Sequence, residues 1–343
     1  MTYDALLLVS FGGPEGTADV LPFLRNVTRG RGVPEDRLSE VAEHYYHFGG
    51  MSPINEWCRS LIAALRRELA DHDMNMPIYW GNRNWPPMLV EAVQRMSGDG
   101  VQRALAFVTS AYGSYSSCRQ YLDDLSAARA AVGASAPTIE KLRHFFDHPG
   151  FIRPFADGVN ASLESIPEED RENIRVVFTA HSIPDVMNEA SGPEGARYTD
   201  QVAEAAALTM SVAGSKLPYN IVWQSRSGPP DSPWLGPDIN DHFKVLADEN
   251  VSAIVVCPIG FLSDHMEVMW DLDIEAARTA QDLGIAFRRT KTPGLDHRVV
   301  SMVRELVAER HQDGPVHRLG ELPLWNPLDD GCCPARRPSG NGR

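Results

Sequence analysis

The sequence predicts an α/β protein built on doubly wound parallel sheets, and three observations support this fold class. Short apolar runs recur along the 343 residues, helical patterns separate them, and the first run is almost unbroken. An unbroken apolar run is typical of a strand that is buried on both faces of a parallel sheet. Strands that alternate with helices pair in parallel through right-handed crossovers. In such sheets, ligands bind beyond the carboxyl ends of the strands.

Seven apolar runs are the candidate strands of these sheets. The first occupies residues 3–11 and stops at Gly12-Gly13-Pro14, because proline cannot continue a central strand. The later runs, in chain order, are Ile78–Trp80, Ala104–Thr109, Val176–Ala180, Ile221–Trp223, Ala253–Cys257 and Ile285–Phe287. The clearest helix starts at Ser52-Pro53, where proline suits the first helical position, and its apolar residues are spaced by three or four up to Leu69.

The two halves of the chain share this rhythm without sharing sequence, which predicts a pseudo-repeat of architecture. A boundary near His148-Pro149-Gly150 divides the chain into an N-terminal lobe at 1–148 and a C-terminal lobe at 149–313. Residues 314–343 are rich in proline, glycine and arginine, and we expect this tail to be partly disordered.

Composition and charge exclude several classes of protein. With 43% hydrophobic and 23% charged residues, the chain is an ordinary globular protein rather than a disordered or fibrous one. The net charge of −14 argues against nucleic acid as the main partner, because such binding needs clustered cations. No apolar run approaches the roughly 18 residues of a membrane span, and the start lacks the basic region of a signal peptide. We therefore expect a cytoplasmic protein without stable membrane insertion.

The run at 176–184 places a histidine at the predicted ligand-binding edge. The strand Val176–Ala180 delivers His181 to the carboxyl edge of the sheet, and Pro184 prevents the strand from continuing. A histidine there can accept a proton near neutral pH or bind a metal through one nitrogen. A histidine that only hydrogen-bonds a loop is the alternative.

A row of carboxylates follows the strand Ala253–Cys257. Steps of four place Glu267, Asp271 and Glu275 on one helical stripe, with Asp264 one turn ahead. Like charges at this spacing destabilise a helix by a few tenths of a kcal/mol per pair, and no basic residue at i+4 offsets them. Such a row suits a hydrated divalent cation or a proton relay. The alternative is a solvated helix face in an acidic protein.

Other side chains fit a planar, anionic, aromatic ligand, because arginine and tyrosine hydroxyls hold carboxylates and aromatic faces stack on a macrocycle. They are Tyr112, Tyr115, Arg119 and Tyr121 after the third run, and Arg25, Arg29 and Arg31 after the first. Singly, each is more often a surface or core residue. The Gly12-Gly13-Pro14 segment has neither of the glycine spacings of phosphate loops, so we reject a nucleotide site.

At this point the sequence resembles the ferrochelatase family, most closely its actinobacterial coproporphyrin type, over nearly the whole chain. Five motifs in the right order carry the resemblance: Leu8–Pro14, Phe48–Pro53, Phe178–Pro184, Trp223-Gln224-Ser225 with Pro233–Pro237, and Gly260–Glu275. The resemblance implies a chelatase-like fold of two similar Rossmann-like lobes, each a parallel sheet flanked by helices, that close on a porphyrin. It also implies insertion of ferrous iron into that ring during haem biosynthesis.

The resemblance also implies roles for individual residues. His181 matches the family's cleft histidine and Glu267 its catalytic carboxylate, the pair assigned to the metal and to pyrrole deprotonation. Asp271 and Glu275 match the acidic row behind them, so the implied metal contacts are these four side chains.

On the porphyrin side of the implied pocket, Ser52 and Tyr121 match contacts to the propionates. Phe11 stands where some bacterial relatives carry a tyrosine that can touch the metal from the opposite face. A phenyl ring cannot do so.

Within the family, the arginines favour coproporphyrin III as the substrate, with coproheme as the product. A tetracarboxylate suits Arg29 and Arg31 together with Ser52 and Tyr121, and the segment after the first strand has too few apolar residues for a membrane-docking lip. The alternatives are a protoporphyrin IX ferrochelatase, a chelatase for another tetrapyrrole or for cobalt, and a non-catalytic two-lobed haem-binding protein. The expected partners are porphyrin, ferrous iron and, transiently, neighbouring enzymes of haem synthesis.

The five cysteines are not a disulfide framework, because they are odd in number and scattered. Many relatives bind an iron–sulfur cluster through one mid-chain cysteine and three near the C-terminus, and such a cluster needs four thiolates. Here the tail supplies only Cys332 and Cys333, and no cysteine lies between Cys118 and Cys257. We expect no cluster.

Overall fold

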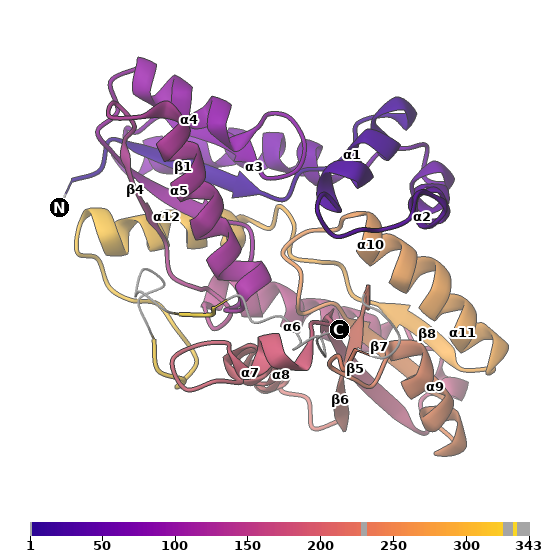
Figure 1. Cartoon of the computed structure of the whole chain (residues 1–343). Coiled ribbons are helices and arrows are strands. Elements are labelled where there is room, and N and C mark those ends of the chain that lie inside the picture. The colour runs from indigo at the N-terminus through magenta and orange to yellow at the C-terminus, as the bar shows by residue number, and fades with distance from the viewer. Residues whose placement is uncertain (1, 228–231, 325–331, 335–343) are drawn as a thin grey trace.

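The computed structural model describes residues 2–227, 232–324 and 332–334, and in this part of the chain it contains two four-stranded parallel sheets with helices on their faces (Figure 1). The strand orders are β2-β1-β3-β4 and β6-β5-β7-β8, so both sheets have the same connectivity. Every strand pair is parallel. The α/β fold class and the pseudo-repeat of architecture are therefore confirmed.

The seven apolar runs all form strands, and an eighth strand was not predicted. The strands are β1 (Ala5–Ser10), β2 (Ile78–Asn82), β3 (Arg103–Val108), β4 (Thr138–Lys141), β5 (Ile174–His181), β6 (Tyr219–Gln224), β7 (Ala253–Cys257) and β8 (Ala286–Arg289). The unpredicted strand is β4, whose sequence Thr-Ile-Glu-Lys has one apolar residue. It lies at the edge of its sheet, where one strand partner and a solvated face require no apolar run.

Helices connect the strands and cover both faces of each sheet. The α-helices are α1 (Val20–Val27), α2 (Glu35–His47), α3 (Ile54–Asp71), α4 (Leu89–Gly98), α5 (Gln120–Val132), α6 (Pro149–Glu164), α7 (Asp185–Glu189), α8 (Arg197–Ala213), α9 (Ile239–Asp248), α10 (Met266–Val268), α11 (Ala277–Asp282) and α12 (His297–His311). Two π-helices, η2 (Tyr115–Arg119) and η4 (Met269–Ala276), and two short 3₁₀ turns, η1 (Thr17–Asp19) and η3 (Glu168–Asp170), complete the set in the described residues. None of the helices described is long and apolar enough to cross a membrane.

The predicted helix at Ser52-Pro53 is α3, which begins one residue later than expected. Pro53 occupies the cap position and Ile54 is the first helical residue. The predicted stripe is buried, including Trp57, Leu61 and Leu65. It packs into the largest apolar cluster of the molecule.

That largest cluster, which we call the shared core, contains residues from both sheets. Leu6 and Leu8 of β1 belong to it together with Val176 and Phe178 of β5, and α3, α6, α8 and α12 complete it. The opposite face of each sheet packs on a separate, smaller cluster with its own helices. One face of each sheet therefore packs on helices of its own lobe, and the other face packs on the shared core, to which both lobes contribute.

Tyr112 strengthens the contact between the two lobes. It follows β3, is almost fully buried, and its hydroxyl donates a hydrogen bond of 2.7 Å to the carbonyl oxygen of Ile259. Beside it, the backbone N–H of Gly113 donates to Oε1 of Gln201 at 2.7 Å. The interpretation of Tyr112 as a ligand contact is thus wrong, because its ring and hydroxyl serve the shared core.

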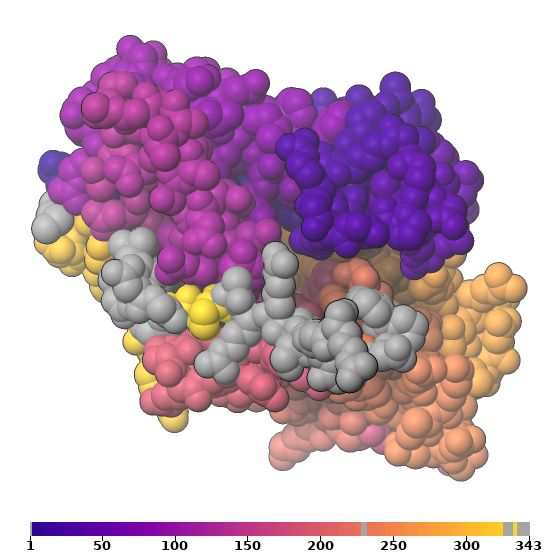
Figure 2. Space-filling model, in the orientation of Figure 1, coloured from indigo at the N-terminus to yellow at the C-terminus, as the bar shows by residue number. Residues whose placement is uncertain are grey.

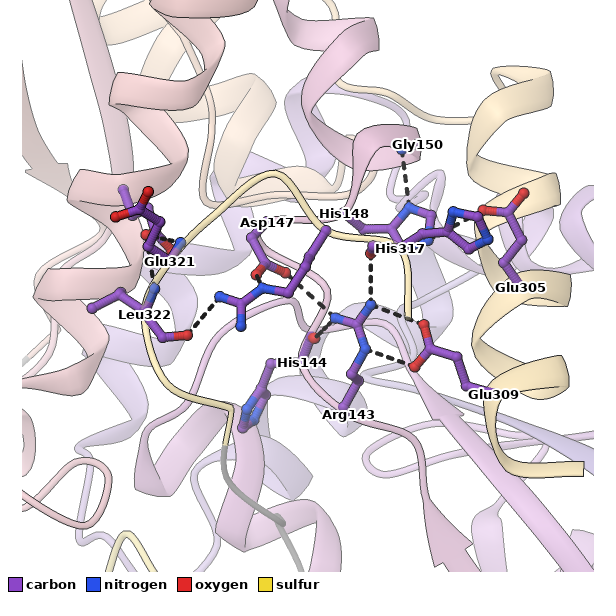
Figure 3. Close-up of polar contacts among 12 residues, drawn as sticks. Arg143, His144, Asp147, His148, Gly150, Glu305, Glu309, His317, Glu321 and Leu322 are labelled. Atoms are coloured by element: carbon purple, nitrogen blue, oxygen red, sulfur yellow. Dashed lines mark hydrogen bonds and ion pairs between the residues drawn. The ribbon is translucent and has the colours of Figure 1, made fainter. Parts of the chain in front are cut away.

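Buried charges also join the lobes, where the chain passes from one to the other (Figure 3). Arg143 donates two hydrogen bonds to the Glu309 carboxylate of α12, at 2.8 and 3.0 Å, and a third to Asp147 at 3.4 Å. The Asp147 side chain is fully buried, and its second oxygen pairs with Arg318 at 2.9 Å. Helix α12 contacts both α6 and α3, so a helix from the second half of the chain packs against the N-terminal lobe. The division at residue 148 stays a prediction.

The predicted disorder of the tail concerns residues 314–343, and most of the relevant positions, 325–331 and 335–343, lie outside the described residues. The part that is described makes specific contacts. The backbone N–H groups of Glu321 and Leu322 both donate to Oε1 of Glu204, at 2.8 and 3.0 Å.

Replacing Arg143 by leucine should lower the free energy of unfolding by about 3 kcal/mol, because Asp147 and Glu309 would be left as buried, under-compensated charges. Arg25→Leu is the matched control, since Arg25 pairs with Glu35 on the surface with both side chains more than half exposed, and should change stability by less than about 1 kcal/mol. Urea unfolding measures both. Equal effects of the two substitutions would contradict the structural role of the buried network.

Candidate functional site

His181 is the last residue of β5 and stands at the carboxyl edge of the second sheet. Its Nδ1 is hydrogen-bonded to the carbonyl oxygen of Ser182, and a carbonyl can only accept, so Nδ1 carries the proton in the neutral ring. Nε2 then keeps a free lone pair and lies 3.6 Å from Oε2 of Glu267. The carbonyl of His181 accepts a 2.8 Å hydrogen bond from the buried Tyr198 hydroxyl. The Ser182 carbonyl therefore orients the imidazole, and Tyr198 fixes the backbone that carries it.

Glu267 reaches His181 from the start of the helical segment that follows β7. This segment begins as α10 and continues directly into the π-helix η4. The Glu267 side chain is about half exposed, at 52%, and that of His181 is 36% exposed, so both face a solvent-accessible space. Figure 2 shows the surface hollowed between the indigo N-terminal segment and the orange segment that carries this helix.

Asp271 lies one turn further along and has an environment unlike that of Glu267. Its Oδ2 accepts hydrogen bonds from the Ser225 hydroxyl and from Nε2 of Gln224, the latter at 3.1 Å. Burial raises the pKa of Asp271 to about 7, against these hydrogen bonds and with a further increase from the negative charge of Glu267. Asp271 can therefore gain or lose a proton near neutral pH, and it is not part of a solvated helix face.

Glu275 is the outer, exposed member of the row, and Oε1 accepts a 2.8 Å hydrogen bond from the indole N–H of Trp270. The remaining carboxylates of this segment, Asp264 and Asp273, belong to a different arrangement. Arg289 of β8 pairs with both of them. The neighbouring strand thus compensates the charge of Asp264 and Asp273, and within the described residues Arg289 forms no ion pair with Glu267, Asp271 or Glu275.

The structure places the predicted porphyrin contacts in the N-terminal lobe. Ser52 is buried and lies close to Gly13. A Cβ atom added to Gly13 would lie 3.0 Å from the Ser52 hydroxyl oxygen. Tyr121 is also buried, and the Arg83 guanidinium lies 4.6 Å above its ring. Neither side chain is widely exposed, and the Tyr121 ring packs in the apolar cluster of the N-terminal sheet.

The arginines after the first strand separate into two groups. Arg29 and Arg31 are exposed in the loop between α1 and α2, and within the described residues neither side chain has an ion-pair partner. Arg25 is paired with Glu35, so it belongs to the surface of the α1–α2 hairpin. Of the three arginines after the first strand, only Arg29 and Arg31 therefore offer positive charge without an ion-pair partner among the described residues.

Sequence reasoning missed several groups around this site. Ser225 and Gln224 hydrogen-bond to Asp271 although they lie 46 and 47 residues away in the sequence. The sequence pointed to them only through the Trp223-Gln224-Ser225 motif that contributes to the family resemblance. His265 lies close enough to Glu267 for its charge to act on the imidazole: burial lowers the pKa of His265, and Glu267 opposes that shift. The aromatic pair His44 and Trp270 was not predicted at all.

Three cysteine side chains come near one another, one more than the sequence suggested. The Cys332 and Cys333 sulfurs lie 3.4 Å apart, and burial raises the pKa of Cys118 with a further increase from Cys332. Across the ranges that the structure describes, no three histidine, cysteine, aspartate or glutamate side chains form a group that could hold a metal ion. The expected lack of an iron–sulfur cluster stays a prediction.

Comparisons with known proteins identify relatives of the whole chain. A family model described as Ferrochelatase matches residues 3–311. A coproporphyrin III ferrochelatase of Nocardia farcinica is 53% identical over 354 residues and covers 100% of both chains. A protein of the same name from Streptomyces griseus is 50% identical over 98% of this chain and 94% of its own.

Solved structures support the fold. SirB from Bacillus subtilis with Fe3+ has a TM-score of 0.52 at 14% identity and covers 90% of this chain and 97% of its own. The sirohydrochlorin chelatase SirB from Bacillus subtilis subspecies spizizenii in complex with cobalt has a TM-score of 0.51, also at 14% identity, and covers 91% and 97%. At such identity the likeness shows a common two-lobed architecture alone.

The raised pKa of Asp271 predicts a pH-dependent stability. Between pH 4 and 7 the folded chain holds a proton on Asp271 that the unfolded chain has released, so the free energy of unfolding should fall as the pH rises. Relative to Asp271→Asn, which does not titrate, wild type should lose on the order of 2 kcal/mol across this window, given about 1.4 kcal/mol per pKa unit and partial solvent access. Urea unfolding from pH 4 to 8 measures the difference, and a constant difference would contradict the assignment.

Proposed function

The chain belongs to the ferrochelatase family, and on that premise we propose that it inserts ferrous iron into coproporphyrin III to give coproheme in haem biosynthesis. The substrate is supported by relatives of about 50% identity over the full chain that carry this name. The observation that carries the chemistry is the free Nε2 of His181 beside Glu267 at the carboxyl edge of β5.

Insertion of a divalent ion replaces two pyrrole protons, so the site needs a base close to the ring nitrogens. His181 supplies one, because its Nδ1–H is engaged by the Ser182 carbonyl and Nε2 keeps its lone pair. The Glu267 carboxylate, 3.6 Å away, stabilises the imidazolium that forms when Nε2 accepts a proton. Glu267 can also take that proton onward toward solvent.

The carboxylate row behind this pair then has two tasks, delivery of the ion and removal of protons. Oxygen ligands suit a hydrated divalent cation, and Asp271, with a pKa of about 7, exchanges protons readily at neutral pH. The carboxylates are spread along the helix rather than gathered around one point. This arrangement suits passage of a substrate ion, because a tight site would retain it.

The N-terminal lobe is proposed to hold the macrocycle. Phe11, directly after β1, and Met51 are large apolar side chains with 37% and 56% exposure, and they offer a surface to the ring face. β1 and β5 occupy equivalent places in their sheets, so Phe11 and His181 stand at corresponding edges of the two lobes. Because a phenyl ring has no donor atom, the metal gains no ligand from Phe11.

Four polar side chains are the proposed partners of the propionates. Arg29 and Arg31 supply unpaired charge, and Ser52 and Tyr121 supply hydroxyl groups. Four carboxylates on coproporphyrin would use such a rim more fully than the two on protoporphyrin IX. A cytoplasmic location and transient contact with neighbouring pathway enzymes remain predictions.

A two-lobed carrier of haem or of another tetrapyrrole is the remaining class of function. It would use the same lobes and the same rim. It would have no use for a base with a free lone pair next to the Glu267 carboxylate, which favours the enzyme.

His181→Ala should reduce the rate of iron insertion at least about 100-fold, because it removes the base, while coproporphyrin affinity stays within about tenfold. Glu267→Gln should also impair turnover strongly. His297→Ala is the control, since its side chain is 87% exposed and lies on α12. Anaerobic insertion assays and porphyrin fluorescence titration measure the two quantities. Retained turnover in His181→Ala would refute the assignment.

Coproporphyrin III should give a higher kcat/KM than protoporphyrin IX. Arg29→Ala should lower kcat/KM for coproporphyrin more than for protoporphyrin, because the extra propionates lose a charged partner. Arg25→Ala, in which the lost charge was already paired with Glu35, should leave the ratio of the two values unchanged. Steady-state kinetics with both porphyrins decides the matter, and an equal or higher value for protoporphyrin IX would contradict the proposed substrate.

A further inference from the structure

An aromatic contact joins the two lobes beside the outer end of the carboxylate row. The imidazole of His44, on α2 of the N-terminal lobe, stacks on the indole of Trp270 with ring centroids 4.0 Å apart and planes inclined by 7°. His47, one turn later on the same helix face, meets the same indole edge-on at 5.6 Å. Two side chains of one lobe therefore fix the plane and rotation of one tryptophan of the other.

The π-helix gives this tryptophan a second contact. In an α-helix, residues i and i+5 lie about 140° apart around the axis, too far for their side chains to meet. The i→i+5 hydrogen bonding of η4 brings residues five apart onto one side. Trp270 can therefore donate its indole N–H to Oε1 of Glu275 at 2.8 Å. The π-helical geometry thus allows the hydrogen bond between Trp270 and Glu275.

The docking of α2 on this segment is reinforced by apolar packing. Met266, directly before Glu267, is buried in the small cluster formed by α1 and α2, where it lies with Phe23, Leu38 and Tyr45. The hairpin α1–α2 thus packs on both ends of the row, through Met266 near His181 and through Trp270 near Glu275.

We propose that Trp270 is a positioning residue for metal delivery: held flat by His44 of the opposite lobe, its indole N–H fixes the outer carboxylate Glu275 in the orientation that receives the ion. This inference rests on the proposed function, since it assigns a role within iron supply. It makes the geometry of the row depend on the closed contact between α2 and η4. Trp270 itself takes no part in the chemistry at the ring.

A double-mutant cycle tests the proposal on iron insertion. Trp270→Phe keeps an aromatic ring on His44 but removes the donor, and should raise KM for ferrous iron about three- to tenfold, with KM for coproporphyrin within twofold. Glu275→Gln should raise KM for iron in the same way. In the Glu275→Gln background, Trp270→Phe should have no further effect, because both substitutions remove the same oriented carboxylate from the path of the ion.

Trp80→Phe is the matched control. It removes an indole N–H that donates to Oδ1 of Asn82 at 2.9 Å, remote from the row, and should leave KM for iron unchanged. A normal KM in Trp270→Phe, or additive effects in the double variant, would overturn the positioning role. His44→Ala should reproduce the effect of Trp270→Phe, and His44→Phe, which keeps the stack, should restore it. A normal KM for iron in His44→Ala would contradict the proposed role of the His44 stack in holding Trp270.

Calorimetric titration with Co2+, without porphyrin, separates this inference from the proposed function. Trp270→Phe and Glu275→Gln should weaken Co2+ binding to a similar extent and without additivity. If the variants show this pattern in binding but wild type inserts no iron, the proposed function fails and the positioning role stands. If Co2+ binding is identical in wild type and Trp270→Phe, the positioning role fails whatever the insertion assay shows.

Discussion

The shared core is the constraint on which the rest of the molecule depends. Both sheets place one face against it, so their carboxyl edges are held in a fixed relation rather than left to a flexible linker. Tyr112 crosses from one lobe to bond the Ile259 carbonyl of the other, just beyond β7. A site assembled from both edges needs this rigidity, because a displacement of about 1 Å in a catalytic group can reduce a rate 100-fold.

On this scaffold, two departures from regular structure set the chemistry. The strand β5 ends at His181, and the carbonyl after it fixes the imidazole proton on Nδ1. The helix after β7 widens into η4, which lets one helix carry carboxylates in three environments: Glu267 beside the base, Asp271 buried against Ser225, and Glu275 exposed beneath Trp270. In the proposed function the same functional group, a carboxylate, has three roles: base partner, proton exchanger and outer receiver of the ion. Burial and hydrogen bonding, rather than spacing, distinguish the environments of the three carboxylates.

The sequence predicts the parts of this arrangement that depend on local pattern. Buried parallel strands are short, nearly unbroken apolar runs, and a proline soon after a strand marks its end, so the position of His181 at the sheet edge could be derived. β4 could not, because an edge strand needs no apolar run. The spacing of four among Glu267, Asp271 and Glu275 fits an α-helix and a π-helix alike, so the widening was not visible.

Contacts between distant segments were beyond such reasoning. The partners of Asp271 lie 46 and 47 residues away, and His44 lies more than 200 residues from Trp270, so no local pattern relates them. The sequence left Tyr112 open as a ligand contact or a core residue for the same reason, since residues of the other lobe help to build its pocket.

The proposed function requires the macrocycle to bind with its nitrogens facing His181. A crystal structure of the chain in complex with coproporphyrin III would show whether it does. We expect Nε2 of His181 to point at the centre of the ring, with Glu267 beside it and the propionates at the N-terminal rim. A macrocycle whose centre lies away from His181, or whose propionates face the carboxylate row, would contradict it.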